Sequence, residues 1–218
     1  MKENKFLIVF AGYPIFVIRN GFYVNDKELN FIRNIKYLNH SDEKNLKLSE
    51  NSDILQLEEL KRIKNFFKES LNDYVSNVLE INNSFSFCQS WSTIQNGKTT
   101  HPSHTHPNHI ISSVYYAKTE KTELIFNVSR SILQDGYYFK YDIKKHNVFN
   151  SHSYNVVLKE GDVIFFPGQL RHGSSINDEK ERIIIGSSFF IDGKLGDKHD
   201  YNNLEIINNK KEGYQNVF

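Results

Sequence analysis

The chain has very little cysteine. Cys88 is the only cysteine among its 218 residues, which excludes an internal disulfide framework and a cluster of thiolate metal ligands. We interpret Cys88 as a small apolar side chain that packs in the interior. A chain without disulfides suits a reducing compartment, and we therefore expect a cytoplasmic protein.

Excess charge and long apolar runs are absent as well. Lysine and arginine total 27 against 26 aspartates and glutamates, so no strong field attracts the chain to nucleic acid or to an acidic membrane. No stretch of about 18 apolar residues could cross a membrane, and the apolar run Lys5–Phe10 is too short for a signal peptide. We expect a small-molecule or side-chain substrate, no membrane partner and no nucleic acid.

Aromatic residues, in contrast, are plentiful. The chain has 17 Phe and 12 Tyr, which supply large surfaces for a core. Its length suits one domain and is short for two, so we expect residues 1–218 to form a single domain. Within it we distinguish N-terminal strands and helices over 1–83, a β-rich core over 84–192 and a polar C-terminal tail over 193–218.

The first fifty residues predict two strands, a short helix and a loop. Phe6–Phe10 and Ile15–Ile18 are rich in β-branched and aromatic residues and flank a turn sequence, which is typical of two strands. Asp26 is the expected N-cap of a helix whose apolar residues recur every third position over Leu29–Leu38. Residues 39–53 are polar and acidic, and we expect a loop there.

The remainder of the chain predicts one long helix followed by many strands. Apolar residues recur at three- and four-residue spacing over Leu57–Val78, which indicates the longest helix. Short β-branched and aromatic runs follow, separated by polar or glycine-containing turns. This order favours an antiparallel sandwich or barrel with helices packed outside. The expected strands are Phe85–Trp91, Ile110–Tyr116, Glu123–Val128, Asn155–Leu158, Val163–Phe166 and Ile183–Ile191.

Histidines cluster in one short segment. Four of the nine lie within residues 100–109. In an extended segment His104 and His106 share a face, so their imidazoles can reach one point. His172 follows an apolar strand and a turn that would bring it to the same sheet, which makes it the candidate third ligand. A solvated polar loop stays open as the alternative, and for His101 and His109 we favour a surface or supporting role.

An arginine follows the third histidine. Arg182 comes ten residues after His172 and opens an apolar strand, where a guanidinium needs an anion. Guanidinium groups bind carboxylates bidentately, so Arg182 suits the far carboxylate of a dicarboxylic ligand. The alternative is a surface arginine beside Glu179 and Glu181.

Taken in order, these motifs resemble the Fe(II)/2-oxoglutarate-dependent oxygenase superfamily. More narrowly, the chain is similar to a group of phage and bacterial oxygenases whose pattern runs from Trp and Gly through His-x-His-Pro to Ser-Gly-Val-Tyr-Tyr. The likeness extends over roughly residues 6–192. The residues that carry it are Ser90, Trp91, Gly97, His104–Pro107, Ser112–Tyr116, Phe165–Pro167, Leu170, His172 and Arg182.

The resemblance implies a fold and a chemistry. The fold is a double-stranded β-helix, a cupin-like jelly roll, that forms the core over 84–192 with the N-terminal helices packed outside. The chemistry is that of an Fe(II)- and 2-oxoglutarate-dependent dioxygenase, which uses O2, decarboxylates 2-oxoglutarate to succinate and hydroxylates a substrate. His104 and His172 correspond to iron ligands, and Arg182 to the partner of the far carboxylate of 2-oxoglutarate.

The chain also departs from the superfamily pattern. His106 stands where an Asp or Glu usually completes the metal site, so the implied triad is His104, His106 and His172. Ile184 stands where a Ser is frequent, which removes a hydrogen bond worth ~1 kcal/mol to the cosubstrate. If strand parity holds through Pro107, Ser112 and Tyr116 face inward, and we expect both to contact 2-oxoglutarate.

Two other functions remain open from the sequence. A cupin-like dioxygenase would bind iron through three histidines without a 2-oxoacid; His106 favours it and Arg182 disfavours it. A non-catalytic jelly-roll binding module would show neither oxygen consumption nor dependence on 2-oxoglutarate. The sequence leaves the oligomeric state open, a homodimer included, and a phage-encoded chain would act in the host cytoplasm.

Overall fold

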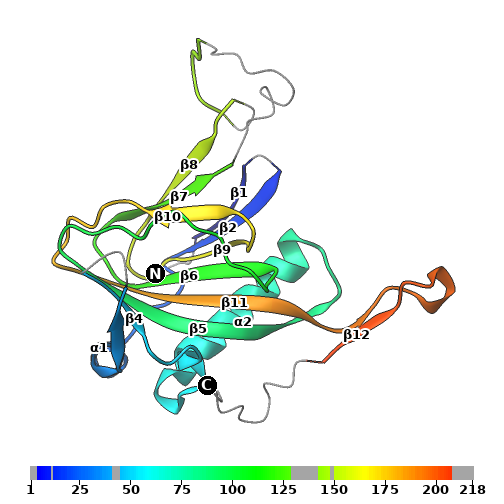
Figure 1. Ribbon diagram of the computed structural model, residues 1–218, viewed down its shortest axis with the longest axis horizontal. Helices are drawn as coiled ribbons and strands as arrows, with labels where there is room; N and C mark the ends of the chain where they lie inside the picture. The colour runs from blue at the N-terminus through cyan, green and yellow to red at the C-terminus, as the bar shows by residue number, and fades with distance from the viewer. Residues whose placement is uncertain (1–3, 11, 41–44, 129–141, 148–149, 208–218) are drawn as a thin grey trace.

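Two antiparallel sheets face each other, and the helices cover the outer side of the larger one (Figure 1). The computed structural model describes residues 4–10, 12–40, 45–128, 142–147 and 150–207. The larger sheet has nine strands in the order β1-β2-β9-β6-β11-β5-β4-β3, with β12 paired to β11. The smaller sheet has three strands in the order β10-β7-β8.

The strands and helices have the following bounds. The strands are β1 Asn4–Phe10, β2 Tyr13–Arg19, β3 Tyr37–Asn39, β4 Leu46–Ser49, β5 Ser84–Asn96, β6 Ile111–Lys118, β7 Thr122–Asn127, β8 Ser153–Leu158, β9 Val163–Pro167, β10 Arg171–Ser174, β11 Glu181–Leu195 and β12 Leu204–Ile206. The helices are α1 Asp26–Asn34, α2 Lys61–Asp73, the 3-10 turns Ile54–Gln56, Glu58–Leu60 and Lys198–Asp200, and a π-helix at Tyr74–Val78.

Alternation along the central strands divides the core in two. In β9, Val163 and Phe165 pack with the helices, whereas Ile164 and Phe166 pack between the two sheets. Successive side chains of a strand point to opposite faces, so a continuous apolar run serves both cores. The expected double-stranded β-helix with outer helices is confirmed.

The long helix is confirmed, and the short one needs a correction. Residues 61–78 form α2 and its π-helical extension, with Phe67 fully buried. The N-cap of α1 is Asn25 rather than Asp26, because the Asn25 side chain accepts from the Glu28 N–H while the Glu28 carboxylate accepts from the Asn25 N–H. This reciprocal capping box places the helix start one residue earlier.

Two segments differ from their expected structure. The expected loop 39–53 contains β4, a short strand that pairs with β5, and Leu38 lies in β3 instead of the helix. In the expected polar tail, Gly193–Leu195 pairs with β12 to form a hairpin that projects from the body (Figure 1). These strands have only three or four residues, which is too short for an alternating pattern to be distinguished from a loop sequence. Residues 208–218 of the tail lie outside the described residues.

No helix in the described part of the chain is long and apolar enough to span a membrane.

Candidate metal centre

His104 and His172 are joined through their backbones. Each donates its N–H to the carbonyl of the other at 2.9 Å, which forms an isolated bridge between the 101–109 segment and β10. His172 thus belongs to the smaller sheet, and His104 lies at the edge of that sheet. The expected extended segment is mostly irregular, since within it only His104 is paired as in a strand.

Gly173 permits this close approach. A Cβ at this position would lie 2.9 Å from the carbonyl oxygen of His101 and 3.1 Å from the backbone of Ser103. Any side chain would therefore push the histidine segment away from β10. The glycine thus helps to place His104 beside His172.

The three predicted ligands converge. The candidate ligand atoms of His104, His106 and His172 all lie within 4.8 Å of one another, and they are the only such group in the described residues. The Nε2 atoms of His104 and His106 are 3.0 Å apart. Two nitrogens bound at right angles to an ion with bonds of roughly 2.1 Å would be separated by about that distance. The spacing therefore fits one metal ion held on one face.

Hydrogen bonds to backbone carbonyls orient two of the rings. Nδ1 of His104 lies 2.7 Å from the Pro102 oxygen, and Nδ1 of His172 lies 2.8 Å from the Leu170 oxygen. A carbonyl can only accept, so each Nδ1 carries the proton and donates. The Nε2 lone pairs are left for a metal, which is the usual arrangement around histidine ligands.

Burial keeps the cluster neutral. Desolvation, together with the neighbouring histidines, lowers the pKa of His106 and of His172 to about 3. Burial lowers the pKa of His104 as well. Neutral imidazoles are the form that binds metals, so the site is ready for a cation at pH 7.

The two weaker candidates lie beside the cluster. His101 stacks on His104 with ring centroids 4.5 Å apart. His109 has its ring 5.3 Å from that of His106, and its Nε2 lies 2.7 Å from the Ser112 hydroxyl. Neither belongs to the group of converging ligand atoms, in keeping with a supporting role.

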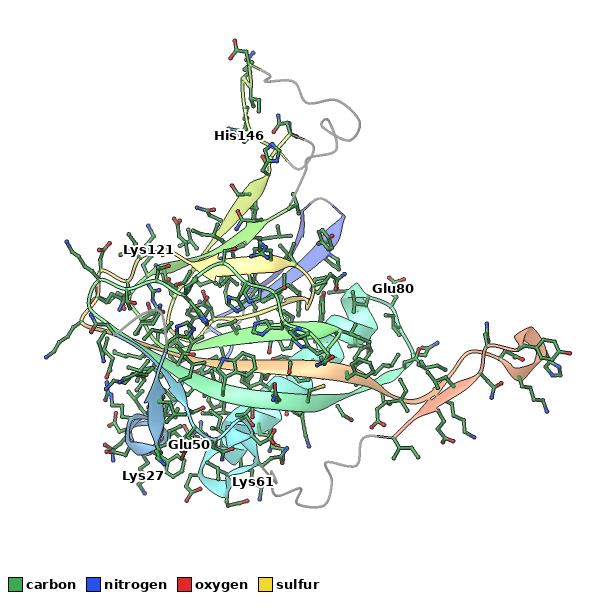
Figure 2. All side chains as sticks on the ribbon, viewed as in Figure 1. Lys27, Glu50, Lys61, Glu80, Lys121 and His146 are labelled. Atoms are coloured by element: carbon green, nitrogen blue, oxygen red, sulfur yellow. The ribbon has the colours of Figure 1, made fainter. Side chains whose placement is uncertain are left out.

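Arg182 is buried and has no acidic partner in the part of the chain that the structure describes. Its side chain is 1% exposed, unlike the exposed Lys27, Lys61 and Lys121 at the periphery in Figure 2. Nη1 donates to the Gln95 side-chain oxygen at 3.2 Å and to a backbone oxygen at 3.3 Å. Nε has no partner among the described residues.

The surface-arginine alternative is wrong. Glu181 pairs with Arg33, and the carboxylate of Glu179 accepts from the Thr119 hydroxyl and from backbone N–H groups. Burial lowers the pKa of Arg182, but arginine starts high enough to stay charged. A buried guanidinium without a carboxylate is costly unless an anion binds to it.

One pocket contains both features. The three histidines, Arg182, Ser112 and Tyr116 all line it, so the inward parity of Ser112 and Tyr116 agrees with the structure. Burial raises the pKa of Tyr116, so its hydroxyl keeps the proton and can donate.

Sequence reasoning missed Gln95, which holds Arg182. Gln95 lies on β5 four residues after Trp91, and both line the pocket. Trp91 packs on Gly186, where a Cβ would come within 2.5 Å of the indole, and its ring lies 5.4 Å from that of His106. Alternation along β5 would have placed Gln95 on the same face as Trp91. Its contact with Arg182, however, depends on how β5 pairs with a strand far away in the sequence.

Residues 89–188 match the model of a family described as "Putative 2OG-Fe(II) oxygenase". No curated protein sequence matches the chain.

Solved structures share the fold at low identity. HygX from Streptomyces hygroscopicus with nickel and 2-oxoglutarate bound is 9% identical, with a TM-score of 0.52 over 81% of this chain and 82% of that chain. A 2OG-Fe(II) oxygenase family oxidoreductase from Burkholderia pseudomallei is 9% identical, with a TM-score of 0.57 over 81% and 84%. The non-heme α-ketoglutarate-dependent epimerase SnoN from nogalamycin biosynthesis is 9% identical, with a TM-score of 0.55 over 81% and 78%.

Proposed function

We infer the function from this premise: through residues 89–188 the chain belongs to the 2OG-Fe(II) oxygenases. The protein is thus an oxidoreductase that uses Fe(II), 2-oxoglutarate and O2. We propose that His104, His106 and His172 hold the iron, and that Arg182, with Tyr116 and Ser112, binds 2-oxoglutarate. Hydroxylation of a substrate is the proposed outcome.

The observation that carries this assignment is the buried Arg182, whose Nε has no hydrogen-bond partner among the described residues, in the same pocket as three converging neutral histidines. The histidines offer three nitrogens to a cation, and the guanidinium offers hydrogen bonds to an anion. A dicarboxylic 2-oxoacid chelates a metal at one end and presents a carboxylate at the other. It therefore satisfies both halves of the pocket at once.

When bound, iron and 2-oxoglutarate supply the oxidising chemistry, in which O2 is consumed, 2-oxoglutarate loses CO2 to give succinate, and one oxygen atom enters a substrate C–H bond. The chain's own residues position these groups and exclude water. His104 and His172 are held by carbonyls that fix their ring planes. Phe126 and Phe166 pack against the inner side of His172, which keeps that side of the metal site dry.

His106 sets this chain apart from a site with two histidines and one carboxylate. A neutral imidazole in place of an anion leaves the metal centre one unit more positive. Imidazole suits iron as a ligand, so the triad stays chemically competent. The added positive charge favours binding of the anionic cosubstrate at the same place.

The two alternatives account less well for the pocket. A three-histidine dioxygenase without a 2-oxoacid leaves Arg182 buried without an anion. A binding module leaves unexplained why three neutral imidazoles converge. The first alternative predicts turnover that does not depend on 2-oxoglutarate, and the second predicts no turnover.

The substrate is proposed to be a small molecule or a protein side chain. Two solved relatives in this fold are described with hygromycin B and with nogalamycin RO bound, which supports a small molecule. The balanced charge of 27 against 26 residues disfavours nucleic acid. The single Cys88 supports a cytoplasmic location, and the oligomeric state stays open, a homodimer included.

The test is a titration of 2-oxoglutarate into the anaerobic Fe(II) protein. We expect a visible metal-to-ligand charge-transfer band, and on admission of O2 we expect succinate to form in proportion to oxygen consumed. A protein that binds iron, shows no band and consumes oxygen without 2-oxoglutarate would be the cupin-like enzyme. One that shows neither band nor oxygen consumption would be the binding module.

A further inference from the structure

Two buried side-chain atoms lack a hydrogen-bond partner in the described part of the chain. One is Nε of Arg182, and the other is the hydroxyl oxygen of Thr93. Both residues are about as buried as a side chain can be, at 1% exposure. Buried polar groups are rarely left unpaired, so each such atom calls for an explanation.

The register of the larger sheet makes these two residues neighbours. Arg182 pairs with Gln95 and Ile184 pairs with Thr93, in an antiparallel ladder without irregularity at this point. Thr93 and Arg182 are therefore diagonal neighbours on adjacent strands. Side chains in this relation lie roughly 7–8 Å apart at their backbones, within reach for long side chains.

Thr93 faces the same side of the sheet as the pocket. Trp91 and Gln95, two residues before and after it on β5, both line the pocket, and residues two apart share a face. Across the ladder, Arg182 and Ile184 also line the pocket. Ile184, directly opposite Thr93, has no hydroxyl to offer.

The chemistry of the two atoms points to one ligand. Nε–H of arginine can only donate, and a threonine hydroxyl can rotate to donate. A carboxylate has two oxygens that accept several hydrogen bonds. One carboxylate placed between β5 and β11 therefore provides acceptors for both orphaned groups.

We propose that Thr93 is a cosubstrate-binding residue, whose hydroxyl donates to the same far carboxylate of 2-oxoglutarate that Arg182 binds. This inference rests on the proposed function. The Thr93 hydroxyl on β5 would replace the hydroxyl that is missing from β11 because position 184 is an isoleucine. Thr93 is not one of the converging metal ligands, so its proposed contribution is to the affinity for 2-oxoglutarate and to the preference for a dicarboxylate.

The experiment compares Thr93→Val with the wild type, because valine has nearly the shape of threonine without the hydroxyl. Anaerobic Fe(II) protein is titrated with 2-oxoglutarate and, separately, with 2-oxopentanoate, which has the same chain length and no far carboxylate. We expect Thr93→Val to bind 2-oxoglutarate about ten- to a hundredfold more weakly, as for one hydrogen bond to a charged group. Its affinity for 2-oxopentanoate should stay the same.

The melting temperature of the ligand-free protein gives an independent readout. Removing an unsatisfied buried hydroxyl should leave that temperature unchanged or raise it, whereas a hydroxyl with a purely structural hydrogen bond would lower it. The proposal thus predicts weaker cosubstrate binding without a loss of stability. Thr93→Ser should retain wild-type affinity.

Ser92→Ala is the matched control on the same strand. The Ser92 hydroxyl faces the helices, where it donates to the Ile184 oxygen at 3.1 Å and accepts from Tyr37 at 2.9 Å. This variant should lose stability and keep its affinity for 2-oxoglutarate. The double variant Thr93→Val/Ile184→Ser should recover affinity, because it moves the hydroxyl to the opposite strand.

Equal affinities of wild type and Thr93→Val for 2-oxoglutarate would overturn the role of Thr93 and leave the proposed function intact. Equal losses for both 2-oxoacids would also overturn it, since the effect would not concern the far carboxylate. If the wild type shows no band, the proposed function fails and this inference fails with it. If Thr93→Val does not fold, Thr93→Ala is judged by the same two titrations.

Discussion

The two faces of the larger sheet differ in how their buried side chains are accommodated. On the helix side, Phe67 is fully buried, with its ring near those of Phe87, Tyr115 and Phe165 at centroid distances of 6.2–6.5 Å. On the pocket side, β11 and β5 present Arg182 and Thr93, each with one polar atom that has no hydrogen-bond partner among the described residues. The helix-side face is fully packed without a ligand, whereas the pocket-side face leaves polar atoms that a ligand could bind.

Single strands contribute to both faces. Phe165 of β9 packs against Phe67, and the next residue, Phe166, lies with its ring 4.6 Å from that of His172. Stability and binding are thus separated by one residue along the chain, and a substitution should affect mainly the face toward which its side chain points. Four substitutions test this separation.

The largest effect is expected from Phe67→Ala. Loss of a buried aromatic ring from a packed core should lower the free energy of unfolding by about 3–5 kcal/mol, measured by urea denaturation. The neighbouring Lys68 is exposed, and Lys68→Ala should change stability by less than about 0.5 kcal/mol. In folded Phe67→Ala protein the iron affinity should be that of wild type. A large loss of iron affinity would mean that the two faces are coupled.

His172→Ala should have the converse effect. Removal of one of three protein ligands should weaken Fe(II) binding by more than about a hundredfold. Loss of a residue that only hydrogen-bonds to a ligand already weakens metal binding by about ten- to a hundredfold, and loss of the ligand itself should cost more. Iron content after dialysis and a competition titration with a chelator give the measurement. Unchanged iron content in the folded variant would contradict the assigned site.

Arg182→Leu should separate the cosubstrate from the metal. Loss of a buried ion pair of this kind costs ~3 kcal/mol, or roughly a hundredfold in 2-oxoglutarate affinity. Fe(II) affinity should stay near wild type. Arg182→Lys should fall between the two, because lysine keeps the charge but lacks the planar fork. Equal affinities of wild type and Arg182→Leu in the charge-transfer titration would exclude Arg182 as the anion partner.

The smallest effect is expected from His106→Asp. A carboxylate at this position supplies an alternative ligand, so iron affinity should stay within about tenfold of wild type. His106→Ala should lose far more, since it supplies none. If His106→Ala also binds iron like wild type, His106 is not a ligand and another group completes the metal site.

Local signals in the sequence account for much of this molecule. The three- and four-residue spacing in α2 and the two-residue spacing of His104 and His106 were sufficient to predict a helix and two converging histidines. The position of Arg182 after His172 predicted an anion site, which its burial supports. Each of these inferences depends on residues close together in the chain.

The missed features depend on pairing between distant segments. Gln95 lines the pocket beside Arg182, and Thr93 lies on the same face of the sheet, only because β5 pairs with β11 in one particular register. Likewise, β10 joins β7 rather than the sheet that contains β9. The register between two strands is set by contacts across the whole sheet, so it cannot be predicted from the sequence of one strand.

The bridge between His104 and His172 also bears on the unfolded chain. An ion held by both residues ties together two points separated by roughly 70 residues, and a cross-link that closes a loop of this length removes chain entropy equivalent to about 4 kcal/mol in the simplest treatment. The protein has one cysteine and cannot obtain such a constraint from a disulfide. A metal bound to the native state would provide it reversibly, so the resistance of the fold to heat would depend on the concentration of free iron.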